Sequence, residues 1–98
     1  MTKEQTKAIV SRYRDILADT YHTTPVRRQE TTNLHERIQH LMWMCDEVEY
    51  FLKEEKVEKA MRWLGFIQGA FWILGIQDIA QSKKDNMPEG ETFDLKRI

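Results

Sequence analysis

The sequence predicts an all-α fold, and three observations lead to it. The chain of 98 residues contains only four glycines and two prolines, so few positions interrupt regular structure. Apolar residues recur at spacings of three and four, the repeat of an amphipathic helix rather than of a strand. Hydrophobic residues make up 41% and charged residues 32% of the chain, a balance that excludes a disordered protein and fits one globular domain.

A first helix is predicted over residues 4–21. Its apolar side chains follow the positions i, i+4, i+7, i+8 and i+12 and form one stripe: Ile9, Tyr13, Ile16, Leu17 and Tyr21. The stretch that follows has no apolar period, and Pro25 disfavours a helical conformation at Thr24. Residues 22–32 are therefore expected to be a loop.

A second helix is predicted over residues 33–54. Asn33 followed by Glu36 resembles a helix start, in which the Asn side chain accepts a free backbone N–H and the Glu carboxylate reaches back. Alternating spacings of four and three then place six residues on one packing seam: Leu34, Ile38, Leu41, Cys45, Val48 and Leu52. The polar residues 53–56 predict a turn, although no glycine marks it and a continuous helix is an alternative.

The third helix, predicted over residues 57–75, repeats this seam with Val57, Ala60 or Met61, Leu64, Ile67, Phe71 and Leu74. Two such seams joined by a short turn predict an antiparallel helical hairpin with the first helix laid across it. Gly75 suits a left-handed helix stop. A short fourth helix is expected over Asp78–Lys84, so that 33–86 form the hairpin and short helix, and residues 87–98 are expected to be a loosely held tail.

The third helix is apolar on nearly every face, because Trp63, Phe66, Ala70, Trp72 and Ile73 lie off its seam. The run is too short for a membrane span, and it includes Arg62 and Gln68. We therefore expect a homo-oligomer and no membrane partner, with an interface formed by Gly65, Phe66, Gly69, Trp72 and Ile73. The two glycines, one turn apart, favour close approach of another helix or of a flat ligand. Relief of crowding beneath Trp43 is an alternative explanation for them.

Charge and cysteine content limit the classes of function. The formal net charge is only −1, which gives no argument for a nucleic-acid polymer as partner. Cys45 is the single cysteine, so an intrachain disulfide is impossible and we expect a cytoplasmic location.

No catalytic or metal site is predicted, and no cofactor. His35 and His40 are separated by about 140° around a helix, so they cannot bind one ion together. Glu36 and His40 share a face, but they supply only two ligands. Asp46 and Glu49 are similar to the first acidic pair, E-x-x-E, of helical nucleotide pyrophosphohydrolases, yet no acid lies between Glu58 and Asp78 to supply the second pair.

A binding site for a small nucleotide is predicted instead. Guanidinium groups pair with phosphates, and aromatic or imidazole faces stack on bases. The candidate ligand-binding residues are Arg27, Arg28, His35, Arg37, Arg62, Trp63 and Gln68, placed at an oligomer seam. The alternative is that these arginines are solvated or paired with acids of a neighbouring helix.

The segments "NLHERIQHLMWMCDEV", "EKAMRWLGFIQGAFWILGI" and "KKDNMP", within residues 33–88, resemble a group of small proteins encoded by bacteriophages and prophages. The R-W-L element with a later Q-G is also similar to phage sponge proteins that block CBASS or Thoeris immunity. That resemblance implies an oligomeric, non-catalytic protein that sequesters a cyclic nucleotide or a cyclic ADP-ribose derivative. The alternatives are a phage module that inhibits a host defence or replication protein through its apolar helical face, and a nucleotide pyrophosphohydrolase.

Overall fold

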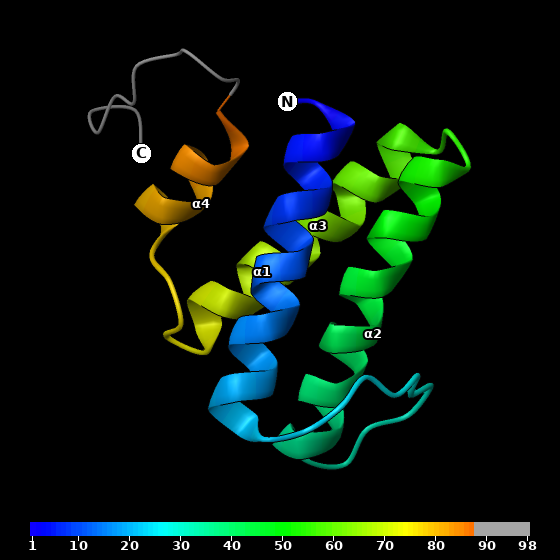
Figure 1. Cartoon of the computed structure of the whole chain (residues 1–98). Coiled ribbons are helices and arrows are strands. Elements are labelled where there is room, and N and C mark those ends of the chain that lie inside the picture. The colour runs from blue at the N-terminus through cyan, green and yellow to red at the C-terminus, as the bar shows by residue number, and fades with distance from the viewer. Residues whose placement is uncertain (88–98) are drawn as a thin grey trace.

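The computed structural model describes residues 1–87 and confirms the all-α prediction: these residues form four helices and no strand. Most of the tail predicted over 87–98 lies outside the described residues. In Figure 1, α1 (Lys3–Tyr21) and α2 (Leu34–Lys53) run side by side in opposite directions, and α3 (Val57–Ile73) passes behind α1. The short α4 (Ile79–Asn86) lies beside the N-terminal half of α1.

Local chemistry accounts for where α1 and α2 begin. The Thr2 hydroxyl accepts the Gln5 N–H at 3.0 Å and caps α1. The Asn33 side chain accepts the Glu36 N–H at 2.9 Å, which confirms the predicted cap of α2. The Glu36 carboxylate was expected to accept the Asn33 N–H. It instead accepts the N–H and the hydroxyl of Thr32, one residue earlier, at 3.0 and 2.7 Å.

The turn after α2 falls where the apolar pattern breaks. Glu55 has a φ of 60°, and the Lys56 N–H bonds to the Phe51 carbonyl at 2.8 Å. α2 therefore ends at Lys53, and the alternative of one continuous helix through residues 53–56 is wrong.

Gly75 ends α3 as predicted, with a φ of 72° that favours glycine. Its N–H bonds to the Trp72 carbonyl at 3.0 Å, and the Ile76 N–H bonds to the Phe71 carbonyl at 2.9 Å. This pair of bonds is a Schellman motif, and it turns the chain toward α4.

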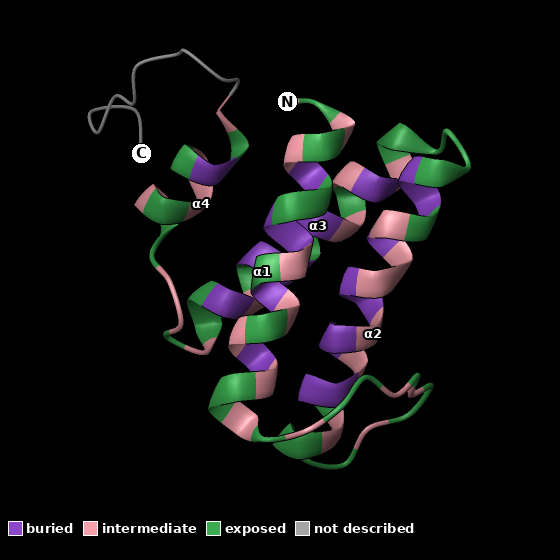
Figure 2. Cartoon of the chain, viewed as in Figure 1, coloured by how far each residue is buried: buried purple, intermediate pink, exposed green. Residues whose placement is uncertain are grey.

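The core lies where the buried stripes of α1, α2 and α3 meet (Figure 2). The largest side chain in it is Tyr13, whose ring centroid lies 4.6 Å from that of Phe71. Two predicted seam residues differ from expectation: Val57 and Leu34 are exposed, and each is the first residue of its helix. Leu34 instead borders the groove described below.

Candidate functional site

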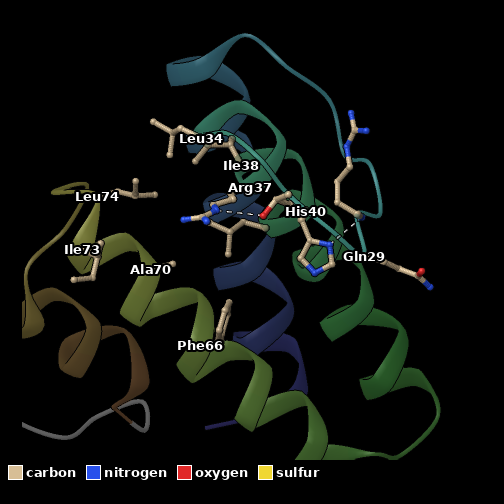
Figure 3. A pocket seen from close by; sticks show the side chains of 12 residues that line it. Gln29, Leu34, Arg37, Ile38, His40, Phe66, Ala70, Ile73 and Leu74 are labelled. Atoms are coloured by element: carbon tan, nitrogen blue, oxygen red, sulfur yellow. Dashed lines mark hydrogen bonds between the residues drawn. The ribbon is translucent and has the colours of Figure 1, made fainter.

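A groove of about 500 Å³ lies between the N-terminal half of α2 and the C-terminal half of α3. Figure 3 shows side chains of α3 on one side and of α2 on the other, with the segment before α2 along the rim. We call it the α2–α3 groove, and its lining residues are Arg28, Gln29, Thr31, Leu34, Arg37, Ile38, His40, Leu41, Phe66, Ala70, Ile73 and Leu74.

The floor of the α2–α3 groove is apolar, and polar groups are confined to its rim. Ile38 and Leu41 are buried at its base, while Phe66 is 63% and Ile73 is 74% exposed along the α3 side. An apolar cavity with a few polar groups along one edge is the usual form of a small-molecule site.

The rim is formed by residues 22–33, which hydrogen bonds hold against α2. The Val26 N–H donates to the Gln39 carbonyl at 3.1 Å, and the Arg28 N–H donates to Nδ1 of His40 at 3.0 Å. Burial, and to a smaller extent the charge of Arg27, lower the pKa of His40 below its ordinary value, so its ring is neutral near pH 7 and Nδ1 can accept this bond.

Two arginines belong to the groove lining, and they differ in what they contact. The Arg28 guanidinium turns back onto α2, where Nη2 donates to Oε1 of Gln39 at 2.6 Å and Nη1 lies 3.6 Å from a Glu36 carboxylate oxygen. Within the described residues, its buried Nε has no hydrogen-bond partner. Arg28 therefore mainly holds the rim in place.

Arg37 is the exposed cation of the groove. Its Nε donates to the Thr31 hydroxyl at 3.2 Å, and Figure 3 shows the guanidinium directed toward α3. Because this contact uses one nitrogen of the planar group, the two terminal nitrogens can form a forked pair with an anion in the groove.

Of the seven candidate ligand-binding residues, the structure brings only Arg28 and Arg37 to the groove. The Arg27 Cζ lies 5.4 Å from the centroid of the Trp43 ring, and Nε2 of His35 lies 3.3 Å from the Thr23 hydroxyl oxygen. Arg62 is exposed near the start of α3, away from the groove.

The remaining two candidates lie inside the fold. Trp63 is half-buried, with its ring centroid 5.8 Å from Trp43 and 4.8 Å from Phe51. Gln68 is buried and donates to the Tyr13 hydroxyl at 3.1 Å and to Asn86 at 2.7 Å.

Two residues predicted for the oligomer interface, Phe66 and Ile73, line the same groove. Trp72 is 51% exposed. A Cβ added at Gly65 or Gly69 would meet nothing within 4 Å, so the proposal that these glycines relieve crowding beneath Trp43 is wrong.

The sequence did not identify Thr31, Leu34 or His40 as part of a site, although each lines the groove. Leu34 carried a usable sign, since an apolar residue directly after a helix cap lies on the first turn, where little packs over it. Nothing local in the sequence distinguished Thr31, whose position depends on the path of the loop.

Other predicted chemical groups are placed in ion pairs or in the core. Asp46 accepts a hydrogen bond from Arg14 at 2.7 Å, and a Glu49 oxygen lies 3.3 Å from the Lys7 nitrogen. Cys45 is buried, and burial raises the pKa of its thiol to about 12. Within residues 1–87 no three His, Cys, Asp or Glu side chains come together as they would around a metal ion.

In the part of the chain that the structure describes, no helix combines the length and the hydropathy that a bilayer span requires. Comparison with known proteins found no matching family model, no matching curated protein and no matching solved structure. The resemblance to phage proteins stays a prediction.

Proposed function

We propose that this protein binds a small nucleotide in the α2–α3 groove and holds it without cleaving it. The observation that carries the proposal is the combination, in one cavity of about 500 Å³, of an apolar floor, an exposed aromatic ring and an exposed guanidinium. This volume falls in the range that small ligands occupy in proteins.

Each part of a nucleotide has a matching feature in the groove. A base is a flat, largely apolar ring system, and it can stack on Phe66 over Ile38 and Ala70. A phosphate is a compact anion, and it can pair with the forked nitrogens of Arg37. Thr31 and Gln29 on the rim supply further hydrogen-bonding groups for the sugar or the phosphate.

The groove chemistry supports binding rather than turnover. Among the described residues that line it, none is Asp, Glu or Cys, and the neutral His40 uses Nδ1 to accept the Arg28 N–H. The residues named for a pyrophosphohydrolase, Asp46 and Glu49, are not part of the groove lining and pair with cations of α1. We therefore favour sequestration over hydrolysis.

The resemblance to phage sponge proteins selects the ligand class to test. In this proposal the ligand is a cyclic nucleotide or a cyclic ADP-ribose derivative that acts as an immune signal, and binding lowers its free concentration. Linear nucleotides such as AMP and ATP share the base and the phosphate, so they are the appropriate comparison ligands.

The test is a thermal-shift and calorimetric screen of the purified chain against cyclic di- and trinucleotides, cyclic ADP-ribose isomers, AMP and ATP. A ligand that binds the folded state raises Tm, and saturation at about 100 times Kd adds roughly 2.7 kcal/mol to the free energy of unfolding. The bound nucleotide should then be recovered intact by chromatography. No shift across the panel would overturn the proposal.

Two matched variants locate the site. Arg37→Ala removes the proposed phosphate contact and should weaken binding at least about tenfold, since charge-assisted hydrogen bonds contribute about 1.5–3 kcal/mol. Arg27→Ala makes the same change of charge on the rim segment, but outside the groove lining, and should bind as the wild type does. Equal losses in both variants would show that general charge attracts the ligand and would contradict this site.

A further inference from the structure

One face of α3 remains uncovered in the single chain. It contains Gly65, Phe66, Gly69, Trp72 and Ile73, with Arg62 one turn before Phe66, and all of these are exposed. We call it the glycine face. Three of its members are large apolar side chains, which is unusual for a surface that only water covers.

The two glycines are not required by the fold of one chain. Both lie inside a helix of 17 residues, where glycine is less favourable than alanine. Neither has a positive φ, and a Cβ at either position would meet nothing within 4 Å. The missing side chains therefore leave space for something outside the chain.

The shape of the glycine face follows from helical geometry. At about 100° per residue, Gly69 lies in the middle of the exposed arc, with Trp72 about 60° to one side and Phe66 about 60° to the other. Ile73 shares the Phe66 side, which is the side that borders the α2–α3 groove. Two apolar ridges thus flank a shallow trough of glycine backbone.

We propose that a second copy of this chain covers the glycine face by pairing α3 with α3 in antiparallel orientation, about a two-fold axis at Gly69. In this register Trp72 lies about 4.5 Å beyond the axis, and Gly65 lies about 6 Å before it. The axis therefore brings Trp72 of one copy over the partner's Gly65, where the absent side chain leaves room. On the other edge, Phe66 packs beside the partner's Ile73.

Charge supports this orientation. The same axis places Arg62 near the C-terminal end of the partner's α3, where the negative end of the helix dipole favours a cation. In a parallel pair, the Arg62 side chains of the two copies would lie next to each other and the two helix dipoles would point in the same direction. Both arrangements are repulsive. In a two-fold pair the same surface must supply both the trough and the side chains that fill it, and the glycine face contains both. An unrelated partner would require only the trough or only the large side chains.

The pairing has a consequence for the groove, and this part rests on the proposed function. Because Phe66 and Ile73 both line the α2–α3 groove, the partner's Ile73 extends the groove wall next to Phe66. The second copy would thereby cover a rim that is open in one chain, and ligand affinity would increase with dimer formation.

The first test measures the mass of the full chain in solution by light scattering over a range of concentrations. The wild type should be a dimer. Gly69→Leu places a branched side chain on the axis, in space that is open in one chain, and should give a folded monomer with an unchanged helical circular dichroism spectrum. A monomeric wild type at every concentration, or a dimer that Gly69→Leu leaves intact, would overturn the pairing.

The second test fixes the register. Gly69→Cys places the two cysteines next to the axis, so mild oxidation should give a covalent dimer in high yield. Ala8→Cys is the control, because it adds an exposed cysteine on α1, and the native Cys45 is buried in both variants. Equal crosslinking of the two variants would overturn the proposed register.

The two proposals fail separately. A dimer that binds no nucleotide leaves the pairing intact and removes the proposed function. A monomer that binds nucleotide through Arg37 supports the function and overturns the pairing, and the glycine face would then be open to a different protein.

Discussion

Two segments of this protein contribute little to its apolar core, α4 and the rim segment 22–33, and polar side chains hold both in place. The first cluster surrounds Asp85, which is 8% exposed and accepts hydrogen bonds from the buried hydroxyl of Tyr13 and from Gln81 at 2.8 Å. The second surrounds Arg28 and Arg37 on the exposed side of α2. We refer to them as the Asp85 cluster and the rim cluster.

The clusters differ in whether their polar groups are fully used. In the Asp85 cluster, Arg12 pairs with Asp85 at 2.8 Å, Gln77 donates to Ser82 at 2.9 Å, and Gln68 exchanges hydrogen bonds with Asn86. In the rim cluster, Arg37 is exposed and uses one nitrogen on Thr31. A fully paired buried cluster stabilises structure, whereas an accessible one with unused donors can bind a ligand.

The largest effect is expected from breaking the Asp85 cluster. Asp85→Ala leaves the Tyr13 hydroxyl without its acceptor and Arg12 without its carboxylate, and hydrogen bonds to charged groups contribute about 1.5–3 kcal/mol. We expect a loss of about 2 kcal/mol in unfolding free energy, measured by urea denaturation, and faster amide exchange across α4.

Asp15→Ala is the matched control for this prediction. It removes a carboxylate that is exposed on α1, and its nearest cation, Arg14, lies 3.9 Å away. Such surface pairs contribute about 0–1 kcal/mol. If Asp85→Ala cost no more than Asp15→Ala, the Asp85 cluster would not hold α4.

The sequence predicted the parts of the fold that local chemistry determines. Helix lengths follow from apolar spacing, the start of α2 from Asn33, and the end of α3 from Gly75. Each of these depends on residues that are close to one another along the chain, so a single sequence carries the information.

The clusters depend on contacts between distant residues, which the sequence alone did not show. Gln68 was assigned to a ligand site, yet it meets Tyr13, which precedes it by 55 residues. Its spacing from Leu64 and Phe71 places it on the buried side of α3, and this indication was available. The polar rim of the α2–α3 groove had no comparable sign, because it depends on the path of residues 22–33.

A smaller effect is expected when the rim cluster is broken. Arg28→Ala removes the 2.6 Å hydrogen bond to Gln39 and the longer contact with Glu36, but the Arg28 side chain is one-third exposed, at 34%. Because water can replace these contacts, we expect a loss of only about 0.5–1 kcal/mol in unfolding free energy. The free energy of nucleotide binding should fall by more than the free energy of unfolding, since the rim positions Thr31 beside Arg37.

The same urea denaturation and calorimetric titration measure both quantities for Arg28→Ala. Arg28→Lys is the informative companion, because it keeps the charge and loses the forked geometry. A variant that lost stability and bound ligand normally would reverse the contrast between the two clusters.

The smallest effect, and the sharpest separation of the clusters, is expected in mild acid. Burial, and then the charge of Arg27, lower the pKa of His40 in the folded state below its ordinary 6.5. At a pH between this lower pKa and 6.5, the folded state therefore binds fewer protons than the unfolded state. The stability that neutral His40 contributes is present above pH 6.5 and is lost as pH falls through the lower folded value. Burial alone would raise the pKa of Asp85, but hydrogen bonds from Tyr13, Arg12 and Gln81 outweigh it and lower that pKa below 3.8.

Amide exchange measured from pH 7 to pH 3 should therefore show the rim segment opening first, at the backbone N–H of Arg28, and α4 opening only below about pH 4. His40→Gln removes the titrating group and should abolish the first step while leaving the second. Simultaneous opening of both segments would mean that the clusters are coupled through α2 and α1, and that a ligand bound at the rim would also stabilise α4.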